Sequence, residues 1–255
     1  YFEASQICEF ITDRYGFDAI LNMLAMYRDK ARTPDILQKV LKLSGTDFDR
    51  EFHAYIEAKA HPWEQALSVE NNLAASLSKE EVVKQLATRD SFALRVRAAE
   101  LFAADGDLPT AVTHYTRALE LFPYATGRGN PYEPLAKLLE QKGDAAQAAV
   151  ILDKLVKTDE NNLEALKNIA RIRSSLGQQQ QALDALEASF YINPFDYKLH
   201  AQAGELSLEL KNFSQALSEF QAALALEPPN IAEANYNVAT AYHALGRQPE
   251  AKRAV

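Results

Sequence analysis

Cysteine is almost absent from this sequence, since Cys8 is its single cysteine among 255 residues. One thiol excludes an intramolecular disulfide and leaves the redox compartment open. The neighbours of Cys8 include Ile7, Phe10 and Ile11, so we expect this thiol to be buried.

Long apolar runs and an excess of positive charge are also missing. No stretch reaches the roughly 18 apolar residues that a membrane span needs, so we expect no transmembrane segment. The chain carries 27 Lys and Arg against 35 Asp and Glu, a net charge of -8. This balance argues against nucleic acid as a partner, because neutralising phosphates needs a basic face.

Several motifs of catalysis are absent as well. No HExxH zinc motif occurs, and none of the five histidines lies four residues from another. The turn around Gly127 and Gly129 lacks the Lys-Ser/Thr pair of a phosphate-binding loop, and no serine lies in a G-x-S-x-G elbow. We therefore predict no catalysis, no metal site and no cofactor for this chain as it stands.

The composition indicates a folded protein, with 47% hydrophobic and 24% charged residues. The chain begins at Tyr1 without a methionine and ends at Val255 inside an expected helix. We expect it to be a piece of a longer protein, whose signal peptide or anchor would lie outside this sequence.

A repeat of about 34 residues organises the second two-thirds of the chain. Its marker is a small residue followed five positions later by alanine: Gly106 and Ala111, Gly143 and Ala148, Gly177 and Ala182, Lys211 and Ala216, Gly246 and Ala251. Successive alanines are 37, 34, 34 and 35 residues apart, which is the period of a helix-turn-helix repeat.

Other features recur with this period. A large or apolar residue follows each alanine by four positions, at Tyr115, Leu152, Leu186, Phe220 and Val255. Proline follows the second helix at Pro123, Pro194 and Pro228, where it cannot continue a helix. Each first helix carries an adjacent pair such as Ala98-Ala99 or Ala203-Gly204, small enough for two helices to approach closely.

Together these features resemble the tetratricopeptide repeat family over residues 92–255, as four complete repeats and a truncated fifth. The resemblance implies a right-handed superhelix of stacked hairpins, an α-solenoid with an extended concave surface. It also implies that the first helix of each hairpin lines that surface, and that the function is to bind a protein or peptide.

Polar side chains gather at the concave positions of the middle repeats. The candidate peptide-binding residues are the cations Lys137, Lys167, Arg171 and Lys198 and the amides Asn168, Gln202 and Asn237. Cations and amide donors suit a carboxylate or an extended acidic peptide. Lys167, Asn168 and Arg171 share one repeat, whereas the terminal-carboxylate clamp of the family spreads such residues over three. The alternative is an ordinary solvated helix face, with Glu164 and Lys167 as surface neighbours.

Residues 1–67 lack the repeat and predict a small helical bundle. Apolar residues at helical spacing lead from Ile7 to Tyr15, again from Ile20 to Tyr27 and from Ile36 to Leu41, with a last helix after Gly45. Between this bundle and the repeats, residues 68–91 predict a helical linker, because Ser78 and Glu81 have the spacing of a capping box.

The front bundle carries a second resemblance. The strings 1–5, Tyr15-Gly16, Ile20-Leu21 and Leu43-Ser44-Gly45 look like the C-terminal helical end of a gluzincin zinc metallopeptidase domain of the peptidase MA group. The resemblance implies that Tyr1 is a catalytic residue, the phenol that stabilises the oxyanion. It also implies zinc in the full-length protein, held by an HExxH motif upstream of Tyr1.

Three hypotheses follow for an all-α protein of this organisation. The first is a protein-interaction module that binds a peptide in the concave groove. The second is the C-terminal region of a zinc metallopeptidase, whose repeats recruit a substrate or partner. The third is self-association through the truncated last repeat, whose apolar face we expect to be exposed. The sequence leaves the compartment open, although the paired resemblances suggest a bacterial protein, periplasmic or secreted.

Overall fold

The computed structural model describes residues 2–64, 66–127 and 129–254, and these fold into two compact units, residues 1–68 and 69–255. Unit 1 contains α1 (Phe2–Tyr15), α2 (Phe17–Arg28), α3 (Thr33–Ile36), a π-helical segment (Leu37–Leu41) and α4 (Gly45–Glu64). A break between α1 and α2 falls at Gly16, whose φ of 80° suits a residue without a Cβ. The prediction of an all-α fold is confirmed.

Aromatic rings form the centre of unit 1. Phe10 of α1 is fully buried, and its ring centroid lies 5.5 Å from that of Phe48, 5.7 Å from Phe52 and 5.3 Å from Tyr55. The prediction of a buried Cys8 is wrong, because this thiol is exposed. At 3.6 residues per turn, Cys8 lies about 200° around α1 from Phe10, on the side away from the core.

Unit 2 begins with α5 (Asn71–Ala75) and α6 (Lys79–Leu86), which pack on the first repeat. Val69 and Ala74 share an apolar cluster with Ala93 and Leu94 of the first repeat. The expected capping box is present, because Ser78 Oγ accepts from Glu81 N and the Glu81 carboxylate accepts from Ser78 N. The segment 68–91 therefore covers the apolar end of the repeats.

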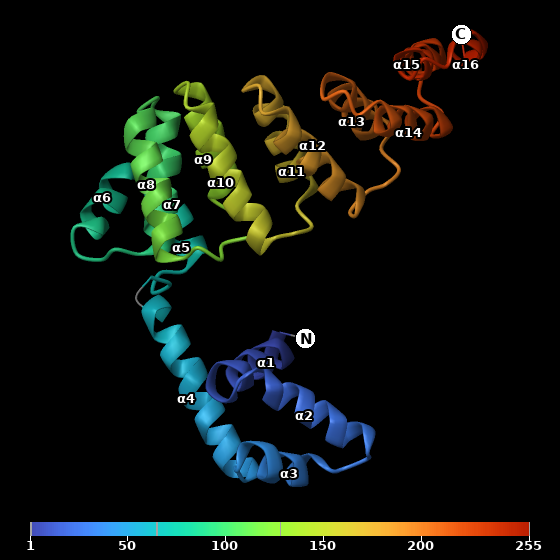
Figure 1. Ribbon diagram of the computed structural model, residues 1–255. Helices are drawn as coiled ribbons and strands as arrows, with labels where there is room; N and C mark the ends of the chain where they lie inside the picture. The colour runs from blue at the N-terminus through green and yellow to red at the C-terminus, as the bar shows by residue number, and fades with distance from the viewer. Residues whose placement is uncertain (1, 65, 128, 255) are drawn as a thin grey trace. The chain divides into compact units, whose positions relative to one another are not determined.

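Helical hairpins follow one another in chain order, coloured from green to red in Figure 1. They are α7 (Phe92–Ala104) with α8 (Leu108–Leu121), α9 (Tyr132–Gln141) with α10 (Ala145–Thr158), α11 (Leu163–Ser175) with α12 (Gln179–Phe190), α13 (Tyr197–Glu209) with α14 (Phe213–Ala225), and α15 (Ile231–Ala244) with α16 (Gln248–Ala254). The prediction of an α-solenoid is confirmed, and each hairpin is one repeat of it.

The repeat marker has a physical cause in the turn within each hairpin. Gly106, Gly143, Gly177 and Gly246 all have φ between 73° and 84°, and Lys211 holds the equivalent place with φ 62°. A left-handed residue ends the first helix and turns the chain, which glycine does without a steric penalty. The alanine five positions later is fully buried in the first four repeats.

A close helix approach lies in the fourth repeat. A Cβ placed on Gly204 of α13 would come 2.5–2.9 Å from three atoms of the Phe220 ring on α14. Carbon atoms in favourable contact are about 3.5–4.0 Å apart, so the ring occupies the space of the missing methyl group. The small residue expected at this position is therefore required by packing.

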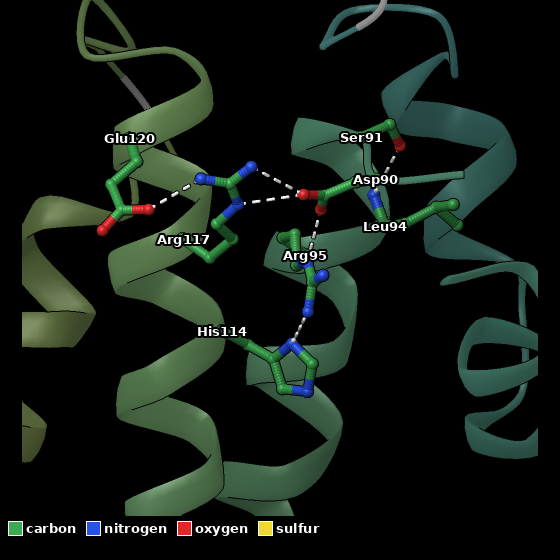
Figure 2. A network of polar contacts seen from close by, with 7 residues as sticks. All are labelled: Asp90, Ser91, Leu94, Arg95, His114, Arg117 and Glu120. Atoms are coloured by element: carbon green, nitrogen blue, oxygen red, sulfur yellow. Dashed lines mark hydrogen bonds and ion pairs between the residues drawn. The ribbon is translucent and has the colours of Figure 1, made fainter. Parts of the chain in front are cut away.

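A network of charged side chains joins the two helices of the first repeat (Figure 2). The carboxylate of Asp90 accepts from Arg95 Nε at 2.6 Å and from Arg117 Nε at 2.9 Å, and Arg95 also contacts His114 Nδ1 at 3.1 Å. Burial opposes the charge of Asp90, but the two guanidinium groups outweigh burial and lower the pKa of its carboxyl. Burial, then the charge of Arg95, lowers the pKa of His114, against a smaller opposing effect of Asp90.

Candidate functional site

Two adjoining cavities lie on the face of unit 2 that the first helices α11, α13 and α15 form. Cavity I, about 560 Å³, lies between α11 and α13, and cavity II, about 360 Å³, lies between α13 and α15. Lys198, Gln202 and Glu205 of α13 line both cavities. One helix is therefore the common wall of the two cavities.

Helical periodicity brings these side chains to one face. On α13 the three shared residues are four and three positions apart, which places them one above another on the helix surface. Lys167 and Arg171 of α11, and Glu233 and Asn237 of α15, have the same four-residue spacing. The repeat period then aligns the three helix faces.

The structure gathers most of the predicted binding residues at these cavities. Lys167, Asn168 and Arg171 line cavity I, Asn237 lines cavity II, and Lys198 and Gln202 line both. Lys137 of α9 is exposed and lines neither cavity. The role of these residues in peptide binding stays a prediction.

Neighbouring carboxylates already neutralise two of the cations in cavity I. The ammonium of Lys167 lies 3.4 Å from carboxylate oxygens of both Glu164 and Asp196, and Arg171 Nη2 lies 2.7 Å from Glu140 Oε2. Burial opposes the charge of Lys167, but Asp196 and Glu164 outweigh burial and raise its pKa. The hydrogen bond that Arg171 donates to Glu140 is likewise the main cause that raises the pKa of Arg171.

Lys198 has a different environment. Its ammonium lies 6.0 Å from the centroid of the Tyr197 ring, and within the described residues it has no carboxylate at ion-pair distance. Lys198 therefore offers its charge and its three hydrogen-bond donors to a ligand.

Glu205 is the corresponding unpaired anion of the site. Across the described ranges its carboxylate has no hydrogen-bond donor or cation within bonding distance. Glu205 is exposed to solvent, yet the partial burial of its carboxyl in the cavities is the largest cause that raises its pKa, and the charges of Glu233 and Glu209 raise it further. The signals in the sequence that point to Glu205 are its three-residue spacing from Gln202 and the acidic Glu233 in the next repeat.

The family model for the bacterial transcriptional activator domain matches residues 89–226, more than half of the chain. The chain belongs to the bacterial transcriptional activator domain family. A tetratricopeptide repeat model also matches residues 202–254 of this transcriptional activator domain chain, so the sequence-based prediction of tetratricopeptide repeats is confirmed.

Solved structures show the same fold. The crystal structure of YrrB, a protein described as having an unusual peptide-binding site, is 21% identical to this domain, with a TM-score of 0.53 over 69% of this chain and 90% of the other. A crystal structure of MamA protein is 19% identical, with a TM-score of 0.51 over 64% of this chain and 87% of the other. The search of curated proteins finds no match.

The features implied by the metallopeptidase resemblance do not enter this site. Tyr1 lies outside the described residues, so its predicted catalytic role stays a prediction. In the part of the chain that the structure describes, His, Cys, Asp and Glu form no group of three or more suited to a metal ion. Among the residues that the structure describes, no helix is long and apolar enough to cross a membrane.

Proposed function

We propose that this chain is a protein-interaction module that holds an extended segment of a partner polypeptide across cavities I and II. The observation that carries the proposal is the shared wall of α13, since a segment lying across that helix fills both cavities. Solenoids commonly use such extended surfaces to bind partners.

The amide side chains at the site suit a peptide backbone. Asn168 lines cavity I, Asn237 lines cavity II, and Gln202 stands between them. Each amide offers both donors and an acceptor, which match the N–H and C=O groups of an extended chain. The description of YrrB as a protein with a peptide-binding site agrees with this use of the fold.

The predicted preference for an acidic peptide becomes narrower in this proposal. Lys167 and Arg171 are paired with carboxylates of the chain itself, and Lys137 lies outside both cavities. Lys198 is then the cation that contacts an acidic group of the partner in cavity I. Lys167 and Arg171 form part of the cavity wall and neutralise carboxylates of the chain itself.

A selection from a random dodecapeptide library tests the module. We expect the full chain to enrich peptides that bind it, and Gln202→Arg to abolish their binding by placing a long cation on the shared wall. Gln180→Arg is the matched control, because Gln180 is an exposed residue of α12 outside both cavities. The proposal fails if no peptide is enriched, or if the enriched peptides bind the Gln202→Arg chain unchanged.

The family match favours a context for this module. We propose that it serves a bacterial transcriptional activator by binding another protein, since the family that matches residues 89–226 bears that description. The net charge of -8 is consistent with a contact to protein rather than DNA by this chain.

The metallopeptidase hypothesis rests on residues 1–67, outside both family matches. The adjoining coding sequence discriminates the two contexts. A DNA-binding domain there supports the activator, whereas HExxH with a downstream Glu and stoichiometric zinc supports the peptidase, with Tyr1 as its oxyanion donor. Self-association through the last repeat is tested separately by sedimentation at several concentrations, where a constant monomer mass would exclude it.

A further inference from the structure

We propose that cavity II binds a basic side chain, lysine or arginine, of the partner peptide. This inference rests on the proposed function, because it assigns the chemistry of one position of the bound peptide. The contact at Lys198 concerns an acidic group of the partner in cavity I, whereas this inference concerns a basic side chain of the partner in cavity II, between α13 and α15.

The walls of cavity II suit the long stem of a basic side chain. Tyr197, Pro228, Pro229 and Ala201 line the cavity, and the buried Phe220 contributes to its floor. Lysine and arginine cover apolar surface with their methylene groups while the charged end reaches polar partners. The aromatic ring adds a surface that attracts a cation.

The polar end of the cavity carries acceptors for that charge. Glu205 comes from α13 and Glu233 from α15, so carboxylates face the cavity from both helices. The Glu233 carboxylate accepts from Asn230 Nδ2 at 3.0 Å, whereas Glu205 has no partner within the residues described. Lys198 lines the same cavity but forms no ion pair with either carboxylate in the described part of the chain. A cation from outside therefore supplies the missing partner of Glu205.

The electrostatics of Glu205 support this assignment. Its pKa is raised by burial and by the neighbouring carboxylates Glu233 and Glu209, so its charged form is disfavoured within the chain alone. Perturbed carboxyl groups in a cavity are characteristic of functional sites. Cavity I has the opposite arrangement, because its cations Lys167 and Arg171 already have carboxylate partners.

The experiment uses a peptide enriched in the library selection and the full chain. We expect a lysine or arginine at one fixed position. With arginine there, its replacement by citrulline, which keeps the shape of arginine but removes the charge, should weaken binding about three- to tenfold. Binding to a Glu205→Gln chain should then be equal for the charged and the citrulline peptide. Glu160→Gln is the matched control, since Glu160 is exposed, lines neither cavity and should leave the preference for the charged peptide intact.

The outcomes separate the two proposals. If no peptide is enriched, both fail. If peptides are enriched and Gln202→Arg abolishes their binding, the module stands, and this inference is overturned when no basic residue recurs. It is equally overturned when the Glu205→Gln chain still prefers the charged peptide over the citrulline peptide.

Discussion

Adding one methyl group to α13 tests how closely Gly204 packs against Phe220. In an exposed helix, Gly→Ala stabilises by about 1 kcal/mol, because glycine loses more backbone entropy on folding. At Gly204 the new Cβ would lie 2.5 Å from the Phe220 ring, roughly 1 Å inside normal contact. Overpacking of this kind costs about 1–3 kcal/mol, so we expect Gly204→Ala to lower the free energy of unfolding by up to ~2 kcal/mol.

The sign of the effect should reverse when the ring is removed. In a Phe220→Leu background the added methyl group has space, and Gly204→Ala should stabilise by up to about 1 kcal/mol through helix propensity alone. Urea denaturation followed by circular dichroism gives the four free energies of the cycle. Hydrogen exchange of α13 and α14 amides then locates the change in the fourth repeat. Stabilisation by Gly204→Ala in the wild-type background would refute the close approach.

Three further predictions concern the turn and the titrating groups. Lys211→Gly should stabilise the chain by about 0.5–1 kcal/mol, because it relieves the strain of a left-handed residue with φ 62°. Lys211→Ala should bring no such gain. Equal urea unfolding midpoints for the Lys211→Gly and Lys211→Ala chains would contradict this prediction. The folded-state pKa of His114 lies below its usual 6.5, so the neutral imidazole favours the folded state at neutral pH, and this contribution is lost as the pH falls. Between about pH 7.5 and 5.5 the urea unfolding midpoint should therefore fall more in wild type than in His114→Gln. The folded-state pKa of Glu205 is raised, so its ionisation destabilises the folded chain as the pH rises through that pKa. Glu205→Gln should therefore raise the urea unfolding midpoint at about pH 7 and leave it unchanged near pH 4. A higher midpoint at both pH values would indicate an effect of packing instead.

The repeats were predictable because each depends on a local constraint that recurs with the period. Ala182 is fully buried where two helices meet, and Gly177 has the positive φ that ends a first helix, so both residue types are fixed by backbone geometry. Such constraints are visible in one sequence, since most repeats meet the same packing problem with the same residue types.

The charge state of the site was not predictable in the same way. Arg171 forms an ion pair with Glu140, 31 residues earlier, and Lys167 forms one with Asp196 in the next repeat. Spacing along one helix cannot show such partners, so both cations seemed available to a ligand from sequence alone. Cys8 was misplaced for a related reason, since apolar neighbours in sequence lie on the far side of the helix.

The common wall of the two cavities constrains how the specificity of this module can change. A substitution on α11 alters cavity I alone, and one on α15 alters cavity II alone. A substitution at Gln202 changes both cavities at once, so in the proposed binding mode variation on α13 must satisfy two ligand contacts simultaneously. Substitutions on α11 or α15 can therefore change one cavity at a time, while α13 keeps the position of cavity I relative to cavity II.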